Sequence, residues 1–87
     1  MVSGDQHAFA KLIGRYQADI FNLTWSRLGG YLPNQVKEIA QETYLRAWKS
    51  RETFDVRKGS FKDWLFMICK NECTDAWRRA HPGRDIP

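Results

Sequence analysis

Cationic and aromatic side chains are interleaved through the second half of the sequence, with one asparagine among them. Lysine and arginine hold backbone phosphates, planar side chains stack on unpaired bases, and an asparagine amide both donates to and accepts from a base edge. This combination suits single-stranded DNA. The candidate residues are Phe54, Arg57, Lys58, Lys62, Asn71, Trp77, Arg78 and Arg79.

The alternative is that the aromatic rings belong to the core and the charges face solvent. The pattern favours this alternative for Phe61 and Trp64. It leaves both interpretations open for Phe54 and Trp77.

Residues 34–49 carry acidic, amide and apolar side chains at spacings of three and four, which gather them on one side of a helix. The set consists of Glu38, Gln41, Glu42, Leu45 and, close to them, Arg46. Such a face can dock on a protein whose arginines meet the acidic groups, with Leu45 or Trp48 as an apolar anchor. The pattern alone favours an ordinary solvated helix face.

Cys69 and Cys73 are four residues apart and share a helix face, where a disulfide would be strained. Half of a zinc site is one interpretation, with His81 as a distant third ligand, but structural zinc sites need four ligands. We therefore expect two small residues on a packed face, and neither a metal nor a cofactor. Phosphate-binding glycine loops and hydrolase motifs are absent from the sequence, so we do not expect an enzyme.

The chain has 87 residues, which suits one domain, and 43% of them are hydrophobic, which argues against intrinsic disorder. The net charge of +4 permits nucleic-acid binding without requiring it. No apolar run reaches the roughly 18 residues of a membrane span, and residues 1–5 are too polar and short for a signal peptide. The expected location is the cytoplasm.

Three amphipathic segments predict an all-α fold, a compact bundle of three main helices. The first runs over about 5–28, with Ser3 or Asp5 as its cap and Gly29-Gly30 as its end; the second runs over about 34–49. Residues 50–59 are an expected loop, Ser60 with Asp63 caps the third helix over about 60–80, and residues 84–87 are an expected loose tail. The predicted core is Phe9, Leu12, Tyr16, Ile20, Ile39, Thr43, Trp64, Leu65 and Ile68.

Three stretches together resemble region 2 of the extracytoplasmic-function (ECF) sigma factors of the sigma-70 family. Residues 4–16, GDQHAFAKLIGRY, resemble the first helix of that domain. Residues 36–48, VKEIAQETYLRAW, resemble its polymerase-binding helix, and residues 61–79, FKDWLFMICKNECTDAWRR, resemble its promoter-reading helix. The resemblance covers nearly the whole chain in the right order.

The resemblance implies a role for each matching position. Glu38, Gln41 and Glu42 would dock on the clamp helices of the largest subunit of core RNA polymerase, although Glu38 stands where the family usually has aspartate. Residues 54–60, Ser60 included, would form a pocket for a base flipped out of the single-stranded non-template −10 element, and Asn71 would contact that base or its neighbour. Lys62, Arg78 and Arg79 would hold phosphates.

The implied function is promoter recognition and melting without covalent chemistry, with an anti-sigma factor as a further partner. Family members also have a C-terminal helix-turn-helix domain, so we expect residues 1–87 to be an isolated or truncated region 2 domain. Two alternatives stay open. A stand-alone helix-turn-helix regulator would place residues 61–79 in a duplex major groove, whereas a helical protein-interaction module would bind no nucleic acid.

Overall fold

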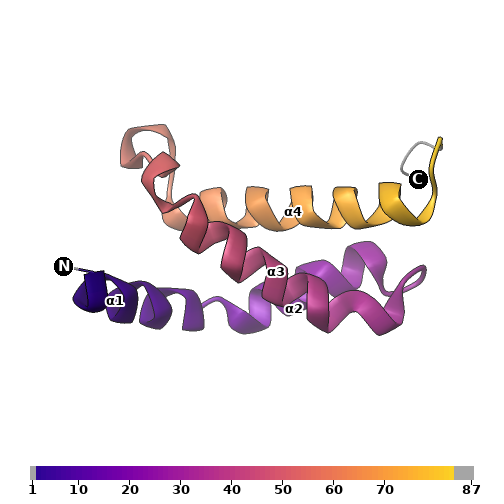
Figure 1. Ribbon diagram of the computed structural model, residues 1–87, viewed down its shortest axis with the longest axis horizontal. Coiled ribbons are helices and arrows are strands. Elements are labelled where there is room, and N and C mark those ends of the chain that lie inside the picture. The colour runs from indigo at the N-terminus through magenta and orange to yellow at the C-terminus, as the bar shows by residue number, and fades with distance from the viewer. Residues whose placement is uncertain (1, 84–87) are drawn as a thin grey trace.

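The computed structural model describes residues 2–83, which form four α-helices (Figure 1). The helices are α1 (Val2–Gly14), α2 (Gln17–Leu28), α3 (Val36–Lys49) and α4 (Phe61–Ala80). Short 3₁₀ turns, η1 (Pro33–Gln35), η2 (Arg51–Thr53) and η3 (Val56–Lys58), lie in the connections. The described residues contain no strand, and the predicted all-α fold is confirmed. The expected tail at 84–87 lies outside the described residues.

The predicted single helix over 5–28 is wrong, because the chain breaks between α1 and α2. The N–H groups of Arg15 and Tyr16 bond three residues back, to the carbonyls of Leu12 (3.2 Å) and Ile13 (2.9 Å). Gly14 just before the break is a weak helix former, and the tightened turn follows from it. Because a turn this short hardly disturbs the spacing of the apolar residues, the sequence pattern looks like that of one uninterrupted helix. Ser3 and Asp5 lie inside α1 and do not precede it.

The boundaries of α3 and α4 agree with the prediction to within two residues. The Ser60 hydroxyl accepts a hydrogen bond from the Asp63 N–H at 3.1 Å, which confirms the serine cap of α4. Gly59 precedes it with φ of 151°, a conformation that residues with a Cβ rarely adopt. The backbone conformation of Gly59 sets the direction in which the chain enters α4.

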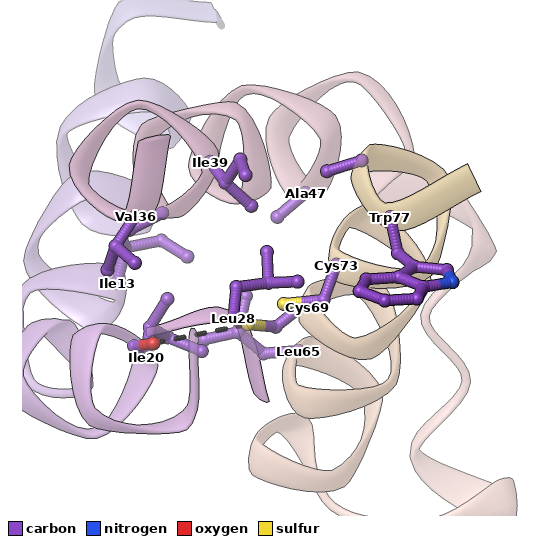
Figure 2. Close-up of a cluster of buried hydrophobic side chains, with 12 residues drawn as sticks. Ile13, Ile20, Leu28, Val36, Ile39, Ala47, Leu65, Cys69, Cys73 and Trp77 are labelled. Carbon is purple, nitrogen blue, oxygen red and sulfur yellow. Dashed lines mark hydrogen bonds between the residues drawn. The ribbon is translucent and has the colours of Figure 1, made fainter. Parts of the chain in front are cut away.

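The core lies where α2, α3 and α4 meet (Figure 2). Four predicted members are buried: Ile20, Ile39, Thr43 and Leu65. The other predicted members are half-buried at its margin: Phe9, Leu12, Tyr16, Trp64 and Ile68. Cys69 and Cys73 are buried as expected, Trp77 is also buried, and the burial of Glu72 was not foreseen.

Small side chains allow the three central helices to approach closely. Thr24 and Cys69 are fully buried, with Oγ1 and Sγ 3.2 Å apart across the α2–α4 contact. The Thr24 and Thr43 hydroxyls donate to the carbonyls of Ile20 (2.8 Å) and Ile39 (3.0 Å), so both are satisfied inside the core. The packed-face interpretation of the two cysteines is thereby supported over the zinc interpretation.

The molecule is elongated, with principal extents of 42 × 24 × 18 Å. Figure 1 shows α3 crossing between the α1–α2 side and α4, with the α3–α4 connection at the same end of the molecule as the N-terminus. Over residues 2–83, no helix has the length and apolar character that crossing a bilayer requires. The candidate loop joins the end of α3 to the start of α4, where its Phe54 ring packs on Phe61 and Phe61 in turn meets Phe9 of α1.

Candidate nucleic-acid and protein interfaces

A pocket of about 250 Å³ lies between the α3–α4 connection and the first two turns of α4. We call it the loop pocket. It is lined by Thr53, Phe54, Asp55, Lys58, Gly59, Ser60, Asp63, Trp64 and Met67. The predicted residues Phe54, Lys58 and Ser60 are thus brought together around one cavity, whose walls combine aromatic rings with a cation and two carboxylates.

Hydrogen bonds and ring contacts fix the shape of the loop pocket. The Trp64 indole N–H donates to the Thr53 hydroxyl at 3.2 Å, and that hydroxyl donates to the Ser50 carbonyl at 2.7 Å. The Phe54 ring packs against Trp64, with centroids 5.5 Å apart, and against Phe61 at 5.7 Å. The α3–α4 connection therefore forms one wall of the loop pocket, and these contacts hold that wall in place. Trp64 was predicted to be core, but it is half-buried and its ring also faces this cavity.

Arg57 is part of the connection without lining the loop pocket. Its guanidinium donates two hydrogen bonds to the Asp55 carboxylate, at 3.1 and 3.0 Å, and its backbone N–H donates a third at 2.9 Å. These bonds lower the pKa of Asp55 and keep its charge. The Arg57 side chain is 86% exposed, so it can still reach a phosphate at the rim.

One face of α4 continues from the loop pocket toward the C-terminal end of the helix. Asp63, Met67, Asn71 and Arg78 follow each other at helical spacing on this face. Met67, Asn71 and Arg78 are all exposed. A DNA strand that ran from the loop pocket along α4 would meet Asn71 one turn beyond Met67. Arg79 is exposed at the same end but points to a different side by the same spacing rule.

Lys62 and Trp77 lie apart from this face. The Lys62 ammonium is 5.3 Å from the centroid of the Phe66 ring, and by helical spacing it projects to another side of α4. Trp77 was a candidate base-stacking residue, and its role stays a prediction. It is 7% exposed, His81 stacks on its ring at 3.7 Å, and the Tyr31 ring meets it at 4.9 Å. Only a small part of the Trp77 side chain is therefore accessible, at a pocket that it lines together with Tyr31 and Cys73.

The exposed side of α3 carries the predicted docking residues. Glu38, Gln41, Glu42 and Leu45 are all exposed, and Leu45 keeps 47% of its surface accessible. They lie opposite the buried stripe that runs from Val36 to Ala47. Trp48, the alternative anchor, is half-buried against Phe9 at 5.3 Å. Leu45 is therefore the apolar group available at the centre of this face.

Arg46 differs from the other members of that set. Its guanidinium is 3.3 Å from the Glu72 carboxylate of α4, and the Glu72 side chain is only 9% exposed. Arg46 therefore bridges α3 to α4, and its docking role stays a prediction. Sequence spacing within α3 carries no information about a partner on α4, which is why this pair was missed.

The two cysteines are unpaired thiols buried against α2. The interaction between the two neighbouring thiols lowers the pKa of Cys69 and raises that of Cys73. His81, the suggested third zinc ligand, lies over Trp77 with its Nδ1 3.2 Å from the Trp77 carbonyl oxygen. Among residues 2–83, no three histidine, cysteine or acidic side chains gather as a metal site would require.

Comparison with known proteins agrees with this arrangement. The family model for Sigma-70 region 2 matches residues 12–82. The chain is 34% identical over 79 residues to the ECF RNA polymerase sigma factor SigW of Bacillus subtilis, an alignment that covers 91% of this chain and 41% of that protein. It is 32% identical over 87 residues to the ECF RNA polymerase sigma-E factor of Haemophilus influenzae, covering 95% of this chain and 43% of that protein.

A third relative is the RNA polymerase sigma factor NccH of Alcaligenes xylosoxydans, 35% identical over 75 residues that cover 86% of this chain and 39% of that protein. No solved structure gives a significant match. The chain spans about two fifths of the length of the curated relatives it matches. The family match covers both the helix with the exposed acidic face and the helix that lines the loop pocket. The chain therefore belongs to the Sigma-70 region 2 family, among the ECF sigma factors.

Proposed function

We propose that this domain docks on core RNA polymerase through α3 and holds one flipped base of the non-template −10 strand in the loop pocket. The observation that carries the proposal is the loop pocket itself, a pre-formed cavity with aromatic walls and a lysine at the connection that the family resemblance marks for base capture. The domain acts as a non-enzymatic initiation factor in the cytoplasm. Its further partners are an anti-sigma factor and, in the whole protein, a C-terminal helix-turn-helix domain.

The docking step uses the exposed face of α3. Glu38 and Glu42 present two carboxylates one turn apart, and Leu45 lies one turn beyond Gln41 on the same side. A partner rich in arginine would pair with the carboxylates and cover Leu45, which gives the contact an apolar centre inside a charged rim. The clamp helices of the largest polymerase subunit are the proposed partner.

The capture step uses the loop pocket and the adjoining face of α4. Unstacking a base costs a few kcal/mol, and stacking on an aromatic side chain returns about 1–3 kcal/mol. Phe54 and Trp64 supply the rings, and Lys58 supplies a cation beside them. Asn71 would contact that base or the next, while Arg57, Lys62, Arg78 and Arg79 would hold phosphates at different points around the helix.

A charge reversal tests the docking step. Glu42→Arg should weaken binding to core polymerase by at least tenfold, because like charges then face each other across the contact. Asp19→Arg on α2 is the matched control and should keep its affinity, since Asp19 is exposed outside the α3 face. Binding is measured by fluorescence anisotropy of the labelled chain, and circular dichroism checks the fold. Equal losses for both variants would contradict the docking step.

Strand preference tests the capture step and separates the two alternatives. The complex of chain and polymerase should bind single-stranded non-template DNA in preference to the same sequence as a duplex. A helix-turn-helix regulator would bind the duplex tightly without polymerase. A protein-interaction module would show no salt-dependent DNA binding in any form.

A further inference from the structure

Phe54 also lines a second cavity. It has a volume of about 410 Å³. The residues around it are mostly aromatic and aliphatic: Ala8, Phe9, Leu12, Trp48, Phe54 and Phe61. We call it the aromatic groove. It joins α1, the end of α3 and the start of α4, and none of the function proposed above uses it.

The rings of the aromatic groove form one connected set. Phe9 meets Trp48 edge-on with centroids 5.3 Å apart, and it meets Phe61 at 5.9 Å. Phe9, Trp48 and Phe61 are each half-buried, so part of every ring remains open to the cavity. A planar group entering here would find an aromatic face or edge on several sides.

A single cation marks the rim of the aromatic groove. The Arg51 guanidinium lies 3.7 Å from the centroid of the Trp48 ring, and its Nη1 donates to the Trp48 carbonyl oxygen at 2.7 Å. Arg51 is exposed, so its remaining donors face solvent. The residues that line the groove include no carboxylate. The groove therefore matches a ligand with an apolar planar body and a negative group at its edge.

The aromatic groove and the loop pocket share one wall. Phe54 lines both cavities, touching Trp64 of the loop pocket at 5.5 Å and Phe61 of the groove at 5.7 Å. The two spaces therefore adjoin the same side chain. Neighbouring bases of an unstacked strand could enter on either side of Phe54 without any change in the fold.

We propose that the aromatic groove holds a second unpaired base, next in the strand to the base in the loop pocket, with Arg51 at its phosphate. The proposal rests on the function proposed above and extends it from one captured base to two. The strand straddles Phe54, which stacks between the two bases. Reading two adjacent positions raises both the affinity for melted DNA and the sequence information taken from it.

A double-mutant cycle between protein and DNA tests the second base. Single-stranded oligonucleotides selected on the complex of chain and polymerase are scanned with one abasic site at a time. Two adjacent positions should each lose about 5- to 150-fold in affinity, the range that corresponds to one stacked base. Trp48→Leu should reduce the loss at one of the two positions and leave the other unchanged. Phe21→Leu, an exposed aromatic residue on α2, is the matched control and should change neither.

A second variant tests the groove independently, in case Trp48→Leu destabilises the fold. Arg51→Gln removes an exposed charge, so the fold should persist. The slope of log DNA affinity against log salt concentration should become shallower by the amount that roughly one phosphate contact contributes. Loss at only one abasic position would overturn the groove proposal and leave the loop pocket intact. Loss at no position would overturn the function proposed above. Weaker polymerase binding by Trp48→Leu with an unchanged abasic scan would assign the groove to the protein partner and also overturn the proposal.

Discussion

At the scale of single residues, the ion pair between Arg46 and Glu72 links α3 to α4 through a nearly buried carboxylate. Glu72 keeps only 9% of its side chain exposed, whereas Arg46 keeps 56%. Removing the partner of a nearly buried carboxylate leaves an uncompensated charge, which is worse than removing both groups. The exposure of Arg46 moderates the effect, because solvent still reaches the contact.

We predict that Arg46→Met lowers the free energy of unfolding by about 1–3 kcal/mol. In a Glu72→Gln background the same substitution should lower it by clearly less, because no buried charge remains to be orphaned. Urea denaturation followed by circular dichroism measures both values. Identical losses in the two backgrounds would mean that the pair is not coupled.

The residue scale also shows where the sequence stops being informative. Helical spacing placed the carboxylates of α3 on the exposed side. Residue type singled out Phe54 and Lys58, and the family resemblance added Ser60; all three line the loop pocket. Helical spacing could not separate Trp77 from a surface aromatic, because the residues that cover Trp77 come from the α2–α3 turn and from the helix end at His81. Contacts between distant segments decide such cases, and one sequence does not contain them.

At the scale of elements, the turn after α2 depends on one of its two glycines. A Cβ at Gly29 would lie 2.6 Å from the Trp25 carbonyl oxygen and 2.8 Å from its ring. A Cβ at Gly30 would meet nothing within 4 Å. The sequence predicted that this pair ends the helix, but only the packing of the Trp25 ring distinguishes the two positions.

We predict that Gly29→Ala lowers stability by about 1–3 kcal/mol, because the backbone or the Trp25 ring must move to accept the methyl group. Gly30→Ala should be neutral or slightly stabilising, since alanine restricts the unfolded chain. Thermal unfolding of the two variants side by side measures the difference. Equal midpoints would show that the turn relaxes without resistance.

The break between α1 and α2 is the element that sequence reasoning missed. Apolar residues continue at spacings of three and four from Phe9 to Leu23, so the periodicity gives no sign of an interruption at Arg15 and Tyr16. Gly14 is a weak helix former, but one glycine within a helix is common and does not by itself predict an end. The break lets the Tyr16 ring pack on Phe61 at 5.9 Å.

At the scale of the whole molecule, the four helices are not equally integrated. The main interhelical contacts join α2, α3 and α4, which share the fully buried residues Ile20, Thr43 and Leu65. Ile13 of α1 is buried, and Phe9 reaches the rings at the end of α3 and the start of α4. Most of the remaining described side chains of α1 are exposed.

We predict that the amides of α1 exchange with solvent at least tenfold faster than those in the centres of α2 and α4, because local opening exposes little apolar surface. Hydrogen exchange followed by NMR measures both sets under native conditions. Filling the aromatic groove with DNA should slow exchange in α1. Uniform protection over all four helices would contradict the prediction.

The uninterrupted length of α4 has a consequence for any DNA bound along it. Twenty residues at about 1.5 Å each make a rod of roughly 30 Å, with the loop pocket at one end and the exposed Arg78 near the other. A continuous helix fixes both the separation and the angular phase of these two points. One residue inserted midway would lengthen the rod by only about 1.5 Å but rotate its far end by about 100°, turning the arginine off the strand's path. Tolerance to insertion should therefore follow the helical repeat.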